Sequence, residues 1–495
     1  MKKQIVIVGG GTAGWMSALW AQHLYNDGSA DITLIESEDI GILGAGEGSI
    51  PRLMDFLQFV KIDYNEFMVE TNATHKLGVS FENWDGNGKK YIHDFFSTNP
   101  DNVPICDSEY WGFLMKNGYD LNDKIASKYM AYNNKSAISL NNTQMVNFSF
   151  HFDAHLVASY FKKIAESRGV KRIEGVITNF VQNRFGDIKT IELENETKVE
   201  NIHFVFDCSG FKRLIIGKLY NTEWISYKDR LTVNSALPFQ LPQSKTDIAT
   251  YTKAIAMKYG WLWQIPLQSR WGCGYVFDNN YINSDEAKKE VENLLGHEIE
   301  CNRTISFEPG RYKSNWINNC IGVGLSTGFV EPLEATAIGM VIIGLLVLTK
   351  FDIDFKDPYN MGQYNWALGE LNDDIVDFLQ YHYITKRTDT EFWNRYRDEK
   401  YMSKKLISTI SGLKESLNFN RKKESVFSTS GWRLVGYGNG ILDENLFIKS
   451  YDSMKDNSII LDLHSNMEDV LNEKHDKLID EIDFLKRIKQ KYGKS

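Results

Sequence analysis

The spacing of apolar and polar residues at the start of the chain predicts a strand, a turn, a helix and a second strand. Residues 4–8, QIVIV, are a β-branched apolar run of strand length, and the glycine turn GGGTAGW follows at once. MSALWAQHL then has helical apolar spacing, and residues 31–37, DITLIES, have the pattern of a second buried strand. This order is a βαβ unit, and it predicts that the chain opens with an α/β domain.

Further along, the pattern predicts longer helices and one more buried strand. Residues 152–170 have helical spacing with a glycine near their end, and residues 202–210, IHFVFDCSG, have that of a strand ending in a small-residue turn. YNWALGELNDDIVDFLQYHY and the charged tail from Asn466 to Ser495 are predicted to be helical. The longest apolar run, AIGMVIIGLLVLTK, is too short to span a bilayer and fits a buried helix.

Composition narrows the class of protein. Hydrophobic residues make up 42% of the chain and aromatic residues 13%, which argues against disorder. The net charge is −9 with no long basic run, so nucleic acid is not expected as a partner. The five cysteines lack metal-ligand spacing, and the first apolar run is too short for a signal peptide. We therefore expect a soluble cytoplasmic protein with free thiols and no metal site.

The glycine turn has the pattern of a dinucleotide-binding loop. Gly9, Gly11 and Gly14 form G-x-G-x-x-G between the first strand and the first helix, and Glu36 ends the second strand. The first glycine permits the turn, the second lets backbone approach a pyrophosphate, and the third allows close helix packing. An acid at the position of Glu36 can bond a ribose hydroxyl. These residues alone leave open whether the dinucleotide is FAD or NAD. The alternative is a glycine turn that only joins the strand to the helix and binds no dinucleotide.

The stretch GWLWQIPL, residues 260–267, places two indoles and a proline in one short strand. No polar residue alternates with them, so a strand with one face in water is not expected. WLWQIP is the W-x-W-x-I-P motif of flavin-dependent halogenases, although two core tryptophans alone would give the same letters. Other stretches agree in order and spacing: VIVGGGTAGWMSA, LGAGEGSIPRLMDFL, FMVETNATHKLGVSFENW, HFDAHLVA, FDCSGFKR, GLSTGFVEPLEAT and DTEFWNRYR. Over most of residues 1–400 the chain resembles flavin-dependent halogenases of the tryptophan-halogenase type.

This resemblance implies an architecture and a reaction. The expected fold is an FAD-binding Rossmann-like domain of the glutathione-reductase/monooxygenase type, with a mostly helical C-terminal subdomain. Residues 1–400 would be the halogenase core, with inserted substrate-side segments at about 85–150 and 215–320, and residues 401–495 would help to cover the substrate site. Reduced FAD, dioxygen and halide would give hypohalous acid through a flavin hydroperoxide. The acid would reach the substrate along a tunnel walled by Trp261, Trp263, Ile265 and Pro266.

The resemblance also assigns catalytic residues. Lys76, in ATHKLGV, matches the family's essential lysine, which would hydrogen-bond hypohalous acid or form a haloamine. Glu334, in EPLEATAIGM, matches the family's glutamate and could take the ring proton or orient the acid. Without the resemblance, Lys76 reads as an ordinary surface lysine and Glu334 as a first-turn acid favoured by the helix dipole. Glu331 does not align with the motif.

The halide, cofactor and substrate residues follow in the same way. Halide is expected at the amides of Thr336 and Ala337, where Glu-Ala-Thr-Ala replaces the family's Glu-Ser-Thr-Gly. Alanine takes a positive φ less readily than glycine, so we expect an anion pocket of a different shape. A different pocket puts chloride in doubt, and we expect a larger, more easily oxidised halide, bromide or iodide, to be favoured. The expected flavin contacts are Gly9, Gly11, Thr12, Ala13, Gly14, Glu36, Gly48, Val176, Leu325 and Ile338. The expected substrate contacts are His93, Phe95 and Trp432.

Two features put free tryptophan in doubt as substrate. Asp94 replaces the proline of the family's His-Pro-Phe element, and no counterpart is evident of the tyrosine pair and acid that grip the amino-acid backbone. We expect an indole- or phenol-like aromatic, with reduced FAD arriving by diffusion from a separate NAD(P)H-dependent flavin reductase. The alternatives are a single-component aromatic hydroxylase and a non-catalytic flavin-binding protein. The sequence leaves the oligomeric state open, a homo-oligomer included.

Overall fold

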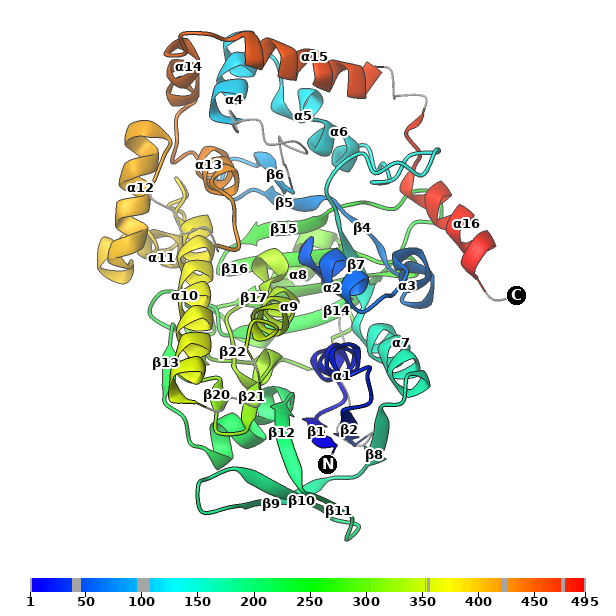
Figure 1. The fold of residues 1–495 in the computed structure, drawn as a ribbon. Helices are drawn as coiled ribbons and strands as arrows, with labels where there is room; N and C mark the ends of the chain where they lie inside the picture. Colours follow the sequence, from blue (N-terminus) through cyan, green and yellow to red (C-terminus); the bar gives the residue numbers. More distant parts are fainter. Residues whose placement is uncertain are drawn as a thin grey trace. The chain divides into compact units, whose positions relative to one another are not determined.

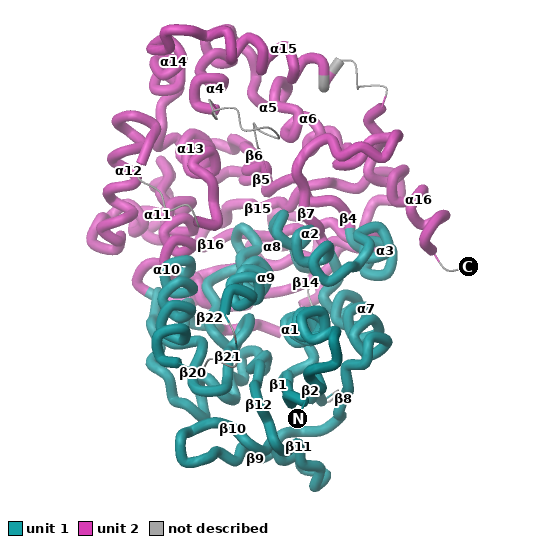
Figure 2. The backbone as a smooth tube through the Cα atoms, viewed as in Figure 1, with its two compact units in different colours: residues 1–73, 152–228, 307–372 teal, residues 74–151, 229–306, 373–495 magenta. Residues whose placement is uncertain are grey.

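The computed structural model describes residues 2–37, 46–95, 107–301, 303–351, 353, 357–419, 425–472 and 477–493. The chain divides into two compact units, and each is assembled from three separate segments (Figure 2). Unit 1 consists of residues 1–73, 152–228 and 307–372, and unit 2 of residues 74–151, 229–306 and 373–495. The two units are described separately below.

Unit 1 is built on a six-stranded sheet with the order β20-β21-β12-β1-β2-β8. Its strands are β1 (Lys3–Val8), β2 (Ala30–Glu36), β8 (Lys171–Glu174), β12 (Ile202–Asp207), β20 (Trp316–Ile317) and β21 (Cys320–Gly322). β1 pairs in parallel with both β2 and β12, and α1 (Thr12–Leu24) connects β1 to β2 and packs against β1 and beside α7 (Ala154–Ser167) (Figure 1). The predicted βαβ unit is confirmed.

The rest of unit 1 consists of short strands and helices. They are β3 (Gly46–Gly48), α2 (Arg52–Phe59), α3 (Tyr64–Glu70), β9 (Ile177–Gln182), β10 (Ile188–Leu193), β11 (Lys198–Glu200), β13 (Trp224–Ser226), β19 (Gly310–Tyr312), β22 (Gly328–Phe329) and α9 (Thr336–Leu348). α9 is the apolar run that the sequence assigned to a buried helix; half of its apolar side chains are buried and the others are only partly exposed. β7 (Ser149–Asp153) and α10 (Pro358–Tyr383) contribute residues to both units.

Unit 2 is built on a seven-stranded sheet with the order β18-β14-β17-β16-β15-β5-β6. Its strands are β5 (Gly78–Glu82), β6 (Lys90–Asp94), β14 (Ser235–Pro242), β15 (Thr252–Met257), β16 (Gly260–Pro266), β17 (Arg270–Phe277) and β18 (Ile305–Ser306). β16, which carries both tryptophans of the W-x-W-x-I-P motif, lies between β15 and β17, and every one of its residues is buried. Burial on both faces explains why the strand lacks polar alternation.

Helices make up most of the rest of unit 2, and several pack beside one another: α14 and α15 lie against α4 (Figure 1). They are α4 (Asp107–Lys116), α5 (Leu121–Lys124), α6 (Ala126–Tyr132), α8 (Ser284–Leu295), α11 (Glu391–Arg395), α12 (Lys404–Ser416), α13 (Thr429–Gly438), α14 (Glu444–Asp452), α15 (Ser458–Asn472) and α16 (Glu481–Tyr492). Where the tail from Asn466 is described, it is largely helical as predicted, in α15 and α16. A short strand, β4 (Thr74–Lys76), pairs with residues 149–151.

The predicted boundary near residue 400 stays a prediction. Residues 401–495 are largely helical where described, and the division into compact units groups them with residues 74–151 and 229–306 of unit 2. These two segments overlap the expected insertions at about 85–150 and 215–320. No helix within the described ranges is long and apolar enough to cross a membrane.

Candidate active site

The glycine turn of unit 1 has the close contacts expected of a dinucleotide-binding loop. Gly9 has a φ of 110°, and a Cβ on it would lie 2.3 Å from the carbonyl oxygen of Cys208. A Cβ on Gly14 would lie 1.8 Å from the carbonyl oxygen of Gly9, so helix α1 approaches the turn more closely than any side chain allows. A Cβ on Gly11 would meet nothing within 4 Å. Gly9 and Gly14 therefore have the close backbone contacts that the sequence predicts, and Gly11 has open space beside it.

Glu36 ends β2 directly beside this turn. A Cβ on Gly10 would lie 1.5 Å from Glu36 Oε2, which places the carboxylate against the loop. Lys162 Nζ lies 3.3 Å from Glu36 Oε1, and the Arg172 guanidinium also donates to that oxygen. The two cations make it less costly to hold an anion in this half-buried place. A carboxylate fixed here, at the end of the second strand, suits a ribose hydroxyl.

The other predicted flavin contacts all belong to unit 1, and one of them lies next to a glycine that approaches the turn. A Cβ on Gly324 would lie 3.0 Å from Ala13 and 3.3 Å from Val341 of α9, and Leu325 is the next residue. Thr12 begins α1, Gly48 ends β3, Val176 follows the glycine after β8, and Ile338 is buried in the first turn of α9. The structure thus gathers the cofactor set in one unit, and its open glycine turn fits a dinucleotide.

Beside Gly48, Glu47 is a titratable group that the sequence did not single out. Burial, with the nearby Asp153 carboxylate as a smaller cause, raises the pKa of Glu47 to about 7. A carboxyl with this pKa carries its proton over much of the neutral range. Its neighbour in the sequence, Gly48, belongs to the expected cofactor set.

The backbone around the start of α9 rules out the first-turn alternative for Glu334 and the backbone argument for an altered halide pocket. Glu334 and Ala335 have φ values of 65° and 56°, both in the left-handed region, whereas α9 begins at Thr336. Glu334 therefore precedes the helix and is not a first-turn acid. Ala337 has helical geometry, so a glycine is not needed there and the backbone argument for an altered halide pocket is wrong. Strain is stored at the two residues before, where it costs on the order of 1–3 kcal/mol each.

Burial does not separate the two glutamates of this segment. Glu331 is fully buried and Glu334 is 4% exposed. The amides of Thr336 and Ala337 belong to the first turn of α9, where backbone N–H groups have no intrahelical acceptor. A halide fits such donors.

In unit 2, Lys76 is a buried lysine and not a surface one. It lies in β4, is 1% exposed, and pairs with Ser149 of β7. Its Nζ lies 5.6 Å from the centroid of the Phe95 ring, one of the expected substrate contacts. Burying an ammonium is costly, so this position needs a reason beyond packing.

A hydrogen-bonded chain ties the lysine strand to the tryptophan motif. The Thr74 hydroxyl donates to the carbonyl oxygen of Pro266 at 2.8 Å and accepts from His151 Nδ1 at 3.1 Å. His151 Nε2 lies 2.9 Å from the Thr252 hydroxyl. Burial, and then the charge of Lys76, hold the pKa of His151 well below its ordinary value, so the ring is neutral and has one donor and one acceptor nitrogen. Lys76 is therefore two residues from a direct link to the motif's proline.

Within the motif, the indoles fill space that a glycine leaves open. Trp261 is 1% exposed and Trp263 is 7% exposed, with ring centroids 6.2 Å apart. Gly274 of β17 lies opposite Trp263 of β16, and a Cβ on this glycine would lie 2.1 Å from Trp263 Cη2. Ile265 and Pro266 complete the buried strand. These side chains form a packed layer, and their role as the wall of a tunnel stays a prediction.

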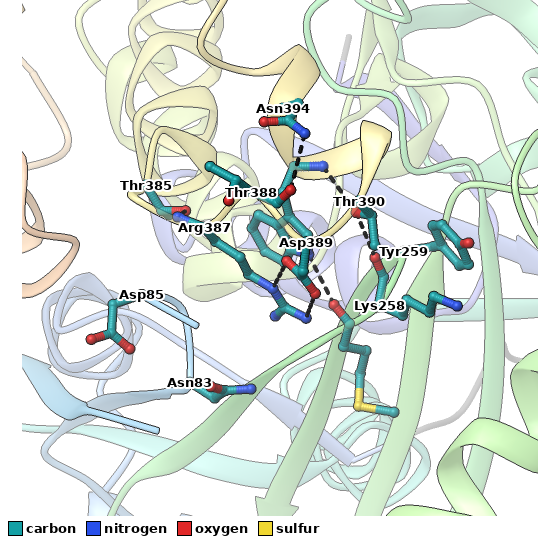
Figure 3. Close-up of polar contacts among 12 residues, drawn as sticks. Asn83, Asp85, Lys258, Tyr259, Thr385, Arg387, Thr388, Asp389, Thr390 and Asn394 are labelled. Carbon is teal, nitrogen blue, oxygen red and sulfur yellow. Dashed lines mark hydrogen bonds and ion pairs between the residues drawn. The ribbon is translucent and has the colours of Figure 1, made fainter. Parts of the chain in front are cut away.

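The motif DTEFWNRYR, residues 389–397, braces the turn that leads into this strand (Figure 3). Trp393 Nε1 donates to the Met257 carbonyl at 3.0 Å, and the Thr390 hydroxyl donates to the Lys258 carbonyl at 3.2 Å. Residues 258 and 259 join β15 to β16, so both bonds hold the β15–β16 turn. Arg387 lies over the Trp393 ring and donates twice to the Asp389 carboxylate, at 2.6 and 2.8 Å (Figure 3).

Two of the three expected substrate residues, His93 and Trp432, pack against one phenylalanine of unit 2, whereas Phe95 lies beside Lys76. Ring centroids of His93 and Trp432 lie 5.5 and 5.0 Å from that of Phe378, and both side chains are buried. Asp94, which replaces the family's proline, is buried and pairs with Lys128 Nζ at 3.1 Å. The end of β6 is therefore held by an ion pair.

His382 is a buried ring that sequence reasoning missed. Its Nδ1 donates to the Phe378 carbonyl at 2.8 Å, and its ring centroid lies 6.4 Å from that of His93. The only available signal was helical spacing in α10, which places residues 378 and 382 one turn apart.

The amino-acid sequence of the chain is similar to those of known tryptophan halogenases. The sequence model of the tryptophan halogenase family matches residues 4–452. Tryptophan 7-halogenase RebH of Lentzea aerocolonigenes is 33% identical over 447 residues, covering 84% of this chain and 82% of RebH. Tryptophan 6-halogenase ThaL of Streptomyces albogriseolus is 30% identical over 484 residues, covering 90% of each chain.

Solved structures agree in fold along nearly the whole chain. A flavin-dependent halogenase of Xanthomonas campestris matches with a TM-score of 0.87 and 30% identity, covering 99% of this chain and 98% of the other. A tryptophan halogenase of Shewanella frigidimarina matches with a TM-score of 0.91 and 25% identity, with the same coverage of each. The predicted α/β fold with a helical C-terminal region is confirmed. The fold and the site define a flavin-dependent halogenase. More particularly, the chain belongs to the tryptophan halogenase family.

Proposed function

We propose that this enzyme uses reduced FAD, dioxygen and a halide to halogenate an electron-rich aromatic molecule, indole- or phenol-like, through hypohalous acid. The observation that carries the proposal is the buried Lys76 ammonium, on a strand that Thr74 joins to Pro266 of the W-x-W-x-I-P motif.

When bound, reduced FAD supplies the two electrons with which dioxygen and halide become hypohalous acid and water. The open turn at Gly11 and the carboxylate of Glu36 are suited to hold its pyrophosphate and ribose. The buried tryptophan strand keeps water and substrate out of the space it fills.

At the aromatic substrate, the ammonium of Lys76 donates to the oxygen of hypohalous acid, or its amine carries the halogen as a haloamine. Either way, a carbon–halogen bond forms on the ring, a proton leaves the same carbon, and the acid's oxygen departs as water. We assign the proton to Glu334, which is held before α9 by a left-handed backbone. His93, Phe95 and Trp432 are the proposed ring contacts.

The halide is proposed to lie at the first amides of α9, those of Thr336 and Ala337. The preference for bromide or iodide over chloride stays a prediction that has lost its backbone argument, because Ala337 has helical geometry. A competition among equimolar chloride, bromide and iodide tests it, and mainly chlorinated product would overturn it.

The partners follow from the reaction. A separate NAD(P)H-dependent flavin reductase would supply reduced FAD by diffusion, and the substrate is a small aromatic molecule. A cytoplasmic location is in keeping with the four described cysteines, which form no disulfides; Cys106 lies outside the described residues.

The test incubates the protein with FAD, a flavin reductase, NADH, the three halides and a panel of indoles and phenols, with mass-spectrometric detection. Halogen incorporated by the wild type and lost in Lys76→Ala, while FAD still binds, supports the proposal. An extra oxygen in place of halogen would favour the hydroxylase. FAD binding without any product across the panel would favour the non-catalytic protein.

A further inference from the structure

A carboxylate from the C-terminal helix grips the residue that precedes the proposed catalytic lysine. Glu481 Oε1 accepts the backbone N–H of His75 at 2.8 Å, and Glu481 Oε2 accepts from His75 Nδ1 at 2.8 Å. Both side chains are fully buried. The family match ends at residue 452, so Glu481 lies outside it.

The two hydrogen bonds to Glu481 fix the backbone of β4, the strand that contains Lys76. His75 lies between Thr74 and Lys76 in β4, and strand alternation places its imidazole and the Lys76 ammonium on opposite faces. Thr74 is tied to Pro266 on one side of His75. Glu481 therefore supplies a second fixed point, one residue from Lys76, without touching the ammonium.

The carboxylate is itself held in place by its own segment. The Glu481 N–H donates to the Asn134 carbonyl at 2.9 Å, and the Ile479 carbonyl accepts from the Ser136 N–H at 2.9 Å. Lys135 Nζ also pairs with Asp480 at the surface, at 2.6 Å, but an exposed ion pair of this kind adds little to the hold on Glu481. Backbone bonds on both sides of Glu481 leave its side chain little freedom to shift.

The surroundings of His75 raise the cost of losing this partner. Ring centroids of Phe148 and Phe484 both lie 4.8 Å from that of His75, and Phe150 lies 6.3 Å away. An apolar cage offers the imidazole and the backbone N–H no replacement acceptor of equal strength, and Ser136 Oγ is 3.4 Å from Nδ1.

We propose that Glu481 is a positioning residue for Lys76: by holding His75 at two atoms it fixes β4, and with it the place where the ammonium meets hypohalous acid. The inference rests on the proposed function. Its consequence is a coupling effect, because the formation of hypohalous acid does not need Lys76 whereas its transfer to the substrate does.

The test compares Glu481→Ala and Glu481→Gln with the wild type, and Asp480→Asn is the matched control on the same segment. For each variant, dioxygen consumption and halogenated product are measured in one reaction. Glutamine keeps an acceptor for the His75 N–H and, if the imidazole changes tautomer, donates to Nδ1. Alanine keeps neither bond.

We expect Glu481→Ala to lower the product formed per dioxygen by about tenfold or more, with dioxygen consumption within about twofold of the wild type. Glu481→Gln should recover most of the ratio, and Asp480→Asn should match the wild type. A ratio unchanged in Glu481→Ala would overturn the inference, as would a parallel fall of product and dioxygen consumption.

If Glu481→Ala does not fold, Glu481→Asp replaces it, since a shorter side chain cannot reach both atoms. A wild type that makes no halogenated product would overturn the proposed function itself. If the wild type makes halogenated product and the Glu481 variants form as much product per dioxygen as the wild type, only the positioning role is overturned.

Discussion

Replacing Gly274 by alanine probes the tryptophan wall with a single methyl group. The added Cβ would lie 2.1 Å from Cη2, 2.2 Å from Cζ2 and 2.8 Å from Cε2 of Trp263. Carbon atoms pack at about 3.5–4.0 Å, so the indole or the strand must move by about 1.4 Å or more. Trp263 lies in a fully buried strand, and overpacking of this kind costs about 1–3 kcal/mol.

The assay combines thermal unfolding with product analysis. Gly274→Ala should lower the Tm by about 1–3 °C, because a chain of 495 residues has an unfolding entropy of about 1 kcal/mol/K. The displaced indole should also open the wall, so that product falls relative to dioxygen consumed. Gly362→Ala is the matched control: this glycine lies in α10 with nothing within 4 Å of an added Cβ, and alanine there should stabilise by about 0.5–1 kcal/mol.

An unchanged Tm and an unchanged product ratio in Gly274→Ala would refute this reasoning. They would mean that Trp263 has room to yield, and that the wall is not the tightly packed layer its contacts indicate.

Three other substitutions test separate contacts. Thr74→Val removes the donor to the Pro266 carbonyl and should destabilise by about 1–3 kcal/mol in urea unfolding; no loss would mean that the link is not energetically significant. Trp393→Phe removes the bond to the Met257 carbonyl, and amide exchange at residues 258–260 should speed up, whereas unchanged exchange would argue against the brace. Glu47 has a pKa raised to about 7 against 4.5 unfolded, so the folded state binds the extra proton and stability falls as pH rises from about 4.5 to 7. Glu47→Gln should flatten that fall, seen as Tm against pH, and an identical pH profile would contradict the assignment.

The glycine turn and the first strands were predictable because their signal is local. Gly9, Gly11 and Gly14 lie within six residues, and each has a steric role that the letters alone suggest. The long apolar helix α9 was predictable for the same reason, since its composition alone requires burial.

Lys76 was not predictable in this way. β4 is only three residues long. In it, Lys76 pairs with Ser149 of β7, and Thr74 is hydrogen-bonded to Pro266, so the burial of the lysine depends on contacts that are distant in the sequence. The resemblance to halogenases pointed to the residue, but only the fold shows that it is buried.

The backbone at Glu334 was also beyond the sequence. Left-handed geometry at a glutamate and an alanine carries no compositional signal, because both residues ordinarily favour helices. The sequence therefore offered a first-turn acid as the alternative to a catalytic Glu334, and it placed the position that favours glycine at Ala337 instead of before the helix.

The bond between His75 and Glu481 has a consequence for synthesis of the protein. The two residues are 406 positions apart. At about 5–20 residues per second, a ribosome makes Glu481 roughly 20 to 80 s after His75. During that interval the strand that bears Lys76 exists without its second anchor, so the nascent chain has its flavin-binding residues well before it has a braced lysine.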